Sequence, residues 1–343
     1  MFPMRNLLFI CISLVLFGCS KPSATPAAEI TVYTHRHYPA DQALFDAFSR
    51  ESGITVNVLK AKADELIKRL EIEGAESAAD VLITVDAGRL VRAKEKGLLQ
   101  AVQSDTISER IPAAMQDPDS QWFALTKRAR VLVYAKDRVD VATLSSYESL
   151  MDEQWRGRIL VRSSQNIYNQ SLLASITHHH GGEAAEAWAK AVVANMARTP
   201  KGNDRDQIRA VAAGKGDLAI VNTYYLGLLL NADDPADQAL AGHMGVFFPN
   251  QGDRGTHINV SGIGVTAHAP NREGAIKLIE FLARKDSQEV FAQSNYEYPV
   301  NPQAQAGELL QSWGEFKSDT VPLTLLGELN TEAAQTFDRA GWR

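Results

Sequence analysis

The sequence predicts an α/β fold of two lobes, with a hinge of extended crossovers and a ligand cleft between the lobes. Three observations carry this prediction. Strand and helix patterns alternate from Glu29 onward, which is typical of α/β domains with a largely parallel sheet. A long strand-like run from Trp122 to Lys136 interrupts the alternation, and a second α/β set follows it. A chain of 343 residues is long enough for two such domains.

The first α/β set alternates short apolar runs with amphipathic ones. In its first helical run, Leu44, Phe45 and Phe48 recur at helical spacing. Gly53 ends that run, since glycine is favoured just past a helix C-terminus. The predicted strands are ITVYTH, ITVNVLKA and DVLITV, and the predicted helices are PADQALFDAFSRESG, ADELIKRLEIEG and AGRLVRAKEKG.

The run WFALTKRARVLVYAK has no helical spacing, so we expect one long extended segment. The second set contains the strands RILVRS and DLAIVN, with helices in YNQSLLASITHHHGG, EAAEAWAKAVVANM and DRDQIRAVAAGKG and from Tyr224 to Asn231. HINVSGIGVTAHAP is expected to form a pair of strands, and NREGAIKLIEFLARKDSQEVFAQS two helices.

Two crossovers are expected between the lobes, near Leu125–Val133 and Phe247–His257. They divide the chain into an N-terminal lobe of residues 29–126 plus 251–300 and a C-terminal lobe of residues 127–250 plus 301–343. Two lobes joined in this way can close around a solute by a hinge motion.

The first 28 residues are expected to direct export rather than to fold. Arg5 precedes an apolar run at Leu7–Phe17, which has secretory length and is too short to cross a bilayer comfortably. The run ends in LFGC, which resembles a bacterial lipobox. We therefore predict a signal peptide at 1–18, lipidation of Cys19 and a Pro/Ala/Ser tether at 19–28, and hence a periplasmic, membrane-anchored protein. The alternative is an ordinary signal peptide cleaved near the end of that tether.

Charge and cysteine content narrow the range of functions. The formal net charge is −6, and no Lys/Arg cluster with interleaved aromatics is present, so we expect no nucleic-acid partner. Cys11 and Cys19 are the two cysteines of the chain. Both precede the predicted fold, so we expect no disulfide in the mature protein.

Four of the nine tyrosines share one kind of position, directly after a predicted strand and at the start of a predicted helix. In open α/β sheets, ligands bind outside the carboxyl ends of the strands. We therefore expect these four side chains to face the cleft, whereas Tyr33 and Tyr134 fall inside strand patterns and are expected in the core. The four are Tyr38, Tyr168, Tyr224 and Tyr225.

A cluster of phenols indicates a site for a hard, highly charged cation. A free phenol ionises near pH 10, so a phenolate at neutral pH needs a strong cation beside it. Ferric iron is such a cation and prefers anionic oxygen donors to thiolates. Three or four phenolates would offset its charge, and His37, next to Tyr38, could add an imidazole nitrogen.

Five segments, HRHYPADQ, VLITVDAGRL, KRARVLVY, SSQNIYNQS and VNTYYLG, resemble motifs of the bacterial periplasmic ferric-iron-binding proteins. The resemblance covers roughly the whole chain after the tether and is closest to the tyrosine-rich subgroup. It implies a two-lobed periplasmic binding protein fold, type II-like. It also implies that the four tyrosines are Fe3+ ligands, with His37 as a further one.

The same resemblance implies an arginine that faces the site, where it holds carbonate or bonds to a ligand phenolate. Arg128 is the first choice for this residue and Arg130 the second. Proteins of this family deliver Fe3+ to an inner-membrane ABC permease and its ATPase. We expect a monomer that meets the membrane only through its lipid.

Two other functions stay open on the sequence. A protein of the same architecture could bind an organic or oxyanion solute with these tyrosines. An exported hydrolase is the second alternative, although NVSGIG has Asn259 where a nucleophile elbow requires glycine, and we expect no enzyme activity. Two tempting metal candidates have structural interpretations. Asp86 is expected to cap a helix, and the consecutive residues His178–His180 point in different directions and cannot chelate one ion together.

Overall fold

A computed structural model describes residues 28–36 and 38–343 of the chain. The predicted signal peptide, almost all of the tether with Cys19, and His37 lie outside the described residues. The alternation of strands and helices is confirmed. The strands are β1 (Glu29–Thr34), β2 (Thr55–Lys60), β3 (Val81–Val85), β4 (Phe123–Ala135), β5 (Ile159–Leu160), β6 (Leu218–Asn222), β7 (Met244–Phe247), β8 (Ile258–Val265) and β9 (Tyr298–Pro299).

The strands form one continuous path in the order β2-β1-β3-β8-β4-β6-β5, with β7 and β9 also paired to β4. The β1–β2, β1–β3 and β5–β6 pairs are parallel, whereas β3–β8 and every pair that β4 makes are antiparallel. The prediction of a largely parallel sheet is therefore wrong, and the sheet is mixed. The antiparallel pairs arise because β4 and β8 are the long crossover strands and run against their neighbours.

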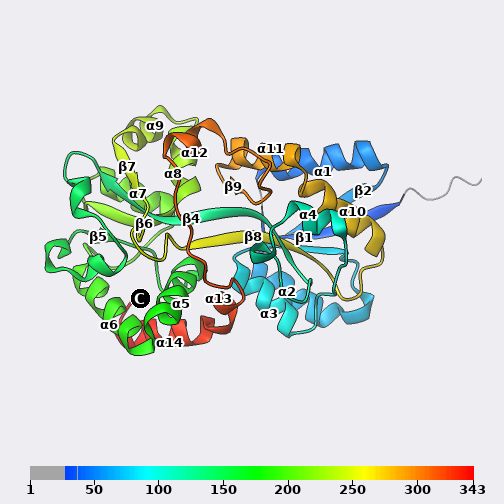
Figure 1. Cartoon of the computed structure of the whole chain (residues 1–343), viewed down its shortest axis with the longest axis horizontal. Coiled ribbons are helices and arrows are strands. Elements are labelled where there is room, and N and C mark those ends of the chain that lie inside the picture. The colour runs from blue at the N-terminus through cyan, green and yellow to red at the C-terminus, as the bar shows by residue number, and fades with distance from the viewer. Residues whose placement is uncertain (1–27, 37) are drawn as a thin grey trace, which may run out of the picture.

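Strand β4 belongs to both halves of the molecule. Its residues Phe123–Ala129 pair with β8, and its residues Arg130–Tyr134 pair with β6. The predicted strand pair in HINVSGIGVTAHAP is wrong, because one strand, β8, occupies that segment and pairs with β3 on one edge and β4 on the other. Figure 1 shows β4 and β8 running side by side from one half to the other. The exact lobe limits given above stay a prediction.

Helices cover both faces of the sheet in each half (Figure 1). In the N-terminal half, α1, α10 and α11 lie on one face and α2 and α3 on the other; in the C-terminal half, α7, α8 and α9 lie opposite α5, α6 and α14. The helices are α1 (Pro39–Ser52), α2 (Ala63–Glu73), α3 (Ala87–Glu95), α4 (Asp105–Arg110), α5 (Ile167–His180), α6 (Gly182–Asn195), α7 (Asp204–Ala212), α8 (Thr223–Leu230), α9 (Pro235–Gly242), α10 (Arg272–Leu282), α11 (Lys285–Asn295), α12 (Glu308–Ser312), α13 (Leu325–Glu328) and α14 (Asn330–Ala340).

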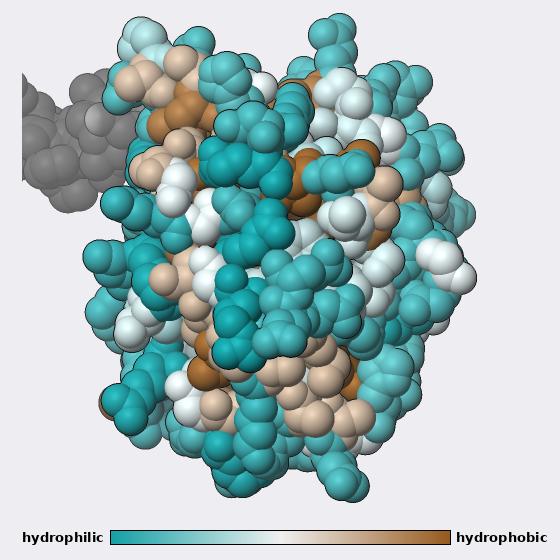
Figure 2. All heavy atoms as spheres, turned by 90° about the vertical axis from the view of Figure 1, so that its left-hand side faces the viewer, coloured by the Kyte–Doolittle hydropathy of each residue, from teal (hydrophilic) through white to brown (hydrophobic). Residues whose placement is uncertain are grey.

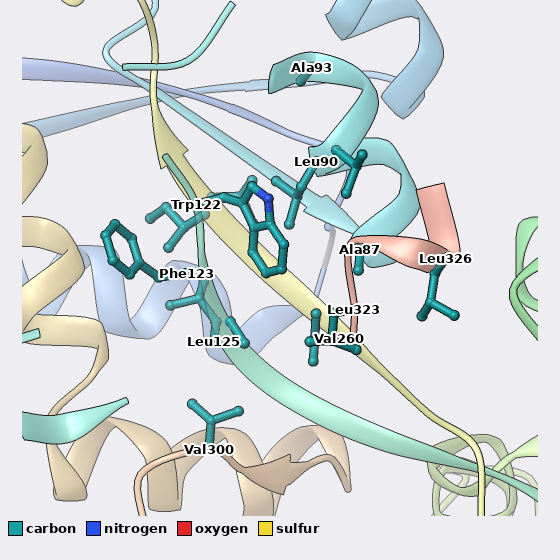
Figure 3. Packing of buried hydrophobic residues seen from close by; sticks show 14 of the residues in the cluster. Ala87, Leu90, Ala93, Trp122, Phe123, Leu125, Val260, Val300, Leu323 and Leu326 are labelled. Atoms are coloured by element: carbon teal, nitrogen blue, oxygen red, sulfur yellow. The ribbon is translucent and has the colours of Figure 1, made fainter. Parts of the chain in front are cut away.

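The buried core continues across the junction of the two halves (Figure 3). Trp122, just before β4, is fully buried and packs near Leu90 of α3. Helix α13 of the C-terminal segment lies against α3 at a very close approach. A Cβ atom on Gly327 would stand 2.5 Å from the Cβ of Val91, so only glycine fits there. The C-terminal segment therefore fixes the position of α3, which begins at the edge of the sheet where the tyrosines gather.

The end of the C-terminal half presents mostly hydrophilic side chains, with apolar ones in small patches between them (Figure 2). Within the part of the chain that the structure describes, every helix is too short or too polar to span a bilayer.

Candidate functional site

Each of the four tyrosines stands at the junction of a strand or loop with a helix. Tyr38 holds an extended backbone conformation directly before α1. Tyr168 is the second residue of α5, and its backbone N–H donates to the capping side chain of Asn166 at 3.1 Å. Tyr224 and Tyr225 lie in the first turn of α8, directly after β6. These helices follow the carboxyl ends of strands β1, β5 and β6, as the sequence pattern predicts.

The structure brings all four phenol rings into one cluster. The hydroxyl oxygens of Tyr168 and Tyr224 are 3.4 Å apart. The Tyr38 ring, from the N-terminal half, meets the Tyr224 ring edge-on with centroids 6.3 Å apart. Tyr225 lies along Tyr224, with ring centroids 4.1 Å apart. Adjacent side chains that would point to opposite faces of a strand thus share one site, because they sit on a helix turn.

Burial makes three of these phenols, Tyr38, Tyr224 and Tyr225, hard to ionise without a cation. Tyr224 is only 1% exposed. Desolvation raises the pKa of Tyr38, with a further contribution from the negative charge of Glu297. Desolvation and the neighbouring Tyr168 also hold the pKa of Tyr224 and of Tyr225 well above the usual phenol value. At neutral pH the hydroxyls of Tyr38, Tyr224 and Tyr225 stay protonated unless a cation replaces their protons.

Both arginines singled out from the sequence lie against the cluster. The guanidinium carbons of Arg128 and Arg130 stand 5.5 and 5.9 Å from the centre of the Tyr168 ring. Each is 1% exposed and is already held by polar partners. Arg128 donates to Ser261, Glu297 and the carbonyl of Val260, and Arg130 donates to Asp204, Asn222 and Asn169.

Two further residues of the site escaped the sequence analysis. Arg36 lies 4.9 Å from the centre of the Tyr38 ring and is paired to Asp41 at 3.0 Å. Glu297 is completely buried, and its two carboxylate oxygens meet Arg36 at 3.0 Å and Arg128 at 3.1 Å. Burial alone would raise the pKa of Glu297, but the two arginines outweigh it and lower that pKa below its usual value. Arg36 stands inside HRHYPADQ and could have been noticed there.

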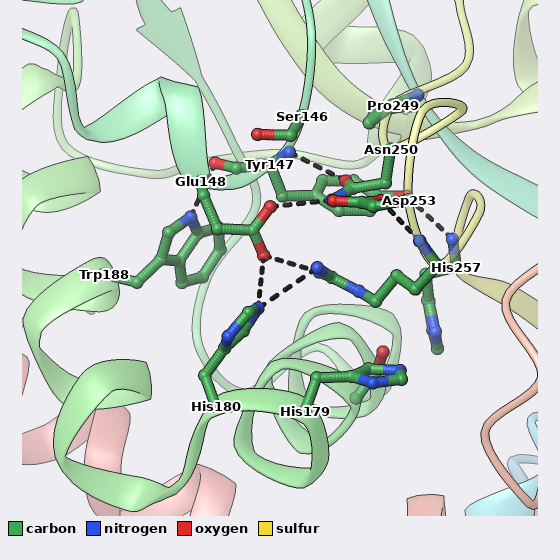
Figure 4. Close-up of polar contacts among 12 residues, drawn as sticks. Ser146, Tyr147, Glu148, His179, His180, Trp188, Pro249, Asn250, Asp253 and His257 are labelled. Atoms are coloured by element: carbon green, nitrogen blue, oxygen red, sulfur yellow. Dashed lines mark hydrogen bonds and ion pairs between the residues drawn. The ribbon is translucent and has the colours of Figure 1, made fainter.

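The predicted structural roles of Asp86 and of the histidine run are confirmed. Asp86 caps α3, with one carboxylate oxygen accepting from the backbone N–H of Gly88 at 2.8 Å. His179 bonds to Asp319 at 2.9 Å, and His180 bonds to Glu148 at 3.1 Å. Figure 4 shows these two rings directed to different partners, beside the segment between β7 and β8 that carries Asn250 and His257.

The remaining candidates and cavities do not compete with the tyrosines. Among the residues that the structure describes, no group of three His, Cys, Asp or Glu side chains could hold a metal ion. Five surface hollows of about 400 to 640 Å³ lie elsewhere, and none of them is lined by the four tyrosines. The predicted ligand His37 and the predicted lipid site Cys19 lie outside the described residues.

Comparisons with known proteins agree with this architecture. The family profile described as bacterial extracellular solute-binding protein matches residues 43–318. The chain is 49% identical to iron uptake protein A1 of Synechocystis over 338 residues, which cover 96% of this chain and 94% of that protein.

Two solved structures are closely similar. That of Trichodesmium IdiA (FutA) in complex with iron and citrate ligands has a TM-score of 0.90 and 49% identity, covering 92% of this chain and 100% of that one. The ferric binding protein of Campylobacter jejuni has a TM-score of 0.87 and 42% identity, with the same coverage. The predicted two-lobed fold is thereby confirmed.

Proposed function

Because this chain belongs to the family of bacterial extracellular solute-binding proteins, we propose that it captures Fe3+ between its lobes for iron uptake. The relatives named above are iron-binding or iron-uptake proteins, which supports a binding role rather than an enzymatic one. The observation that carries the proposal is the convergence of Tyr38 with Tyr168, Tyr224 and Tyr225 from the opposite lobe.

The charges around the phenols suit a ferric phenolate complex. Fe3+ with four phenolates carries one excess negative charge. Arg162 also lies at the site, with its guanidinium carbon 5.9 Å from the centre of the Tyr168 ring. The ion-paired groups around the phenols are therefore four arginines and three carboxylates: Arg36, Arg128, Arg130 and Arg162 with Asp41, Asp204 and Glu297. These groups carry one excess positive charge, which offsets that of the complex before any further anion is counted. Buried charges are tolerated where they are compensated in this way.

In this proposal Fe3+ first meets Tyr168, Tyr224 and Tyr225 of the C-terminal lobe. Closure then brings Tyr38, with His37, from the N-terminal lobe. Arg128 is the arginine proposed to hold a small anion such as carbonate or to bond a ligand phenolate, with Arg130 as the second choice. The Trichodesmium structure is a complex with iron and citrate ligands, and citrate is therefore a second candidate for the anion in this proposal.

The rest of the proposal concerns export and delivery. A signal peptide at 1–18 and a lipid on Cys19 would hold the protein in the periplasm at a membrane. The loaded protein would pass Fe3+ to an ABC permease and its ATPase, and it would act as a monomer.

A visible titration tests the function. Adding ferric citrate to the purified protein should produce a phenolate-to-iron charge-transfer band that saturates at one equivalent. A protein that gives no such band does not bind Fe3+ through its tyrosines. A thermal-shift comparison with sugars, polyamines and phosphate tests the alternative of an organic or oxyanion solute, because a ligand stabilises only the protein that binds it.

Iron binding should release protons, and acid should weaken it. Since burial raises the pKa values of Tyr38, Tyr224 and Tyr225, these phenols are protonated in the unloaded protein, and each must lose its proton to bind Fe3+. We expect about three to four protons released per Fe3+. A pH-stat titration, corrected with a ferric citrate blank, measures this number. Release of less than one proton per iron would show that the phenols stay neutral.

A further inference from the structure

We propose that Asp86 and Ser171 form an interlobe latch, in which the Asp86 carboxylate holds the helix of Tyr168 against the N-terminal lobe and slows the release of iron. The inference rests on the proposed function. It assigns Asp86 a role beyond the helix cap that its sequence position indicates, and it makes Asp86 a positioning residue that acts through Ser171.

The two carboxylate oxygens of Asp86 accept hydrogen bonds from different donors. Oδ1 caps α3 by accepting from the Gly88 backbone N–H at 2.8 Å. Oδ2 accepts from the Ser171 hydroxyl at 2.8 Å and from the Asn259 side-chain amide at 2.5 Å. Asp86 and Ser171 are 0% exposed. The cap therefore leaves one oxygen available, and that oxygen reaches across to α5 of the other lobe.

The backbone of Asp86 is shaped for this contact. Its φ of 84° lies in the left-handed region, which a residue with a Cβ rarely adopts and which persists only where the surroundings determine it. Its own N–H donates to the carbonyl of Val260 on β8 at 2.8 Å, and Asn259 beside it donates to the carboxylate. The crossover strand thus fixes Asp86 in an unfavourable conformation that directs Oδ2 toward α5.

Ser171 transmits the contact to the metal site. It lies three residues after Tyr168 on α5, so the two side chains share one face of the helix. Beside the latch, Val85 of β3 packs against Ile167 and Tyr168 in a small apolar cluster. Opening the lobes would break the hydrogen bond between Ser171 and Asp86. It would also expose the apolar cluster and the Asp86 carboxylate to water. A bond that exists only in the closed form shifts the equilibrium toward closure.

A matched pair of alanine variants tests the latch. Ser171→Ala removes the interlobe donor, and alanine suits a helix interior. Ser175→Ala is the control. Ser175, one turn further along the same helix, is also 0% exposed and donates to Asp319 at 2.6 Å, and Asp319 bonds His179 of the same helix. Both variants lose a buried hydroxyl that donates to a carboxylate, but only the first loses a link to the N-terminal lobe.

Iron release is measured by following the charge-transfer band after an excess of a strong chelator is added. Ser171→Ala should release iron about 10- to 100-fold faster than the wild type, the range expected for loss of a hydrogen bond to a charged group. Ser175→Ala should stay within about twofold of the wild type. The saturated band should be unchanged in both, since every ligand remains. Urea unfolding of the unloaded proteins checks that both variants fold.

Two outcomes would overturn the latch: release from Ser171→Ala at the wild-type rate, or equal acceleration in both variants, which would indicate general weakening of α5. A wild-type protein without any iron band is a different result. It would refute the proposed function and the latch with it, whereas a normal wild-type band with unaffected Ser171→Ala refutes the latch alone.

Discussion

Replacing Tyr224 and Tyr225 together with phenylalanine should abolish the charge-transfer band at equimolar iron and lower the affinity for Fe3+ by at least about 10⁴-fold. Removing a group that only supports a metal ligand lowers metal affinity by about 10- to 100-fold. Removing a ligand itself should lower it by more than about 100-fold, and removing two ligands multiplies the two factors. Phenylalanine keeps the rings that stack 4.1 Å apart and removes only the hydroxyls. The fold should therefore survive while the donors are lost. A titration in which citrate competes with the protein for Fe3+ measures the affinity.

Tyr33→Phe is the matched control for this experiment. Tyr33 is 1% exposed, and its hydroxyl donates to Glu73 at 3.0 Å, away from the tyrosine cluster. Its loss should leave the band and the affinity unchanged. A double variant at 224 and 225 that keeps the wild-type band would refute tyrosine ligation, even if the protein still bound iron by other groups.

The sequence predicted the local elements of the fold better than their pairing. The helix from Pro39 to Ser52 and the long strand from Phe123 to Ala135 follow from spacing within a short window. That window says nothing about which strands become neighbours. The antiparallel partners of β8 come from β3 and β4, more than 120 residues earlier in the chain. No local pattern distinguishes such a strand from half of a hairpin.

In the site, too, residues in local patterns could be predicted from the sequence, whereas long-range partners could not. The four tyrosines could be placed because each follows a strand and opens a helix, a position that local patterns reveal. Glu297 lies in none of these patterns, and its partners Arg36 and Arg128 are 261 and 169 residues away along the chain. A buried carboxylate between two arginines is visible only after folding. The same holds for Ser171, whose bond to Asp86 joins two lobes that sequence spacing cannot orient.

Glu297→Gln should destabilise the unloaded protein by about 3 to 5 kcal/mol, because breaking a buried ion pair leaves its partner charge uncompensated. Glutamine has nearly the same shape but cannot neutralise Arg36 and Arg128, which are both 1 to 2% exposed. Arg36 keeps Asp41, whereas Arg128 retains only the neutral acceptors Ser261 and Val260. Most of the loss should therefore come from Arg128. Urea unfolding at pH 7 measures it.

The pH dependence of this loss of stability shows whether it comes from the missing charge of Glu297 or from altered packing. The pKa of Glu297 is lowered in the folded protein, so its ionised form contributes stability above the unfolded value of about 4.3, and that contribution declines as pH falls through the folded value. The difference in free energy of unfolding between the wild type and Glu297→Gln should therefore become smaller as the pH falls to about 4 and below. Glu186→Gln, at a surface pair with Arg339, should change stability far less at any pH. A gap at position 297 that stays constant into acid would mean that glutamine disturbs packing rather than charge.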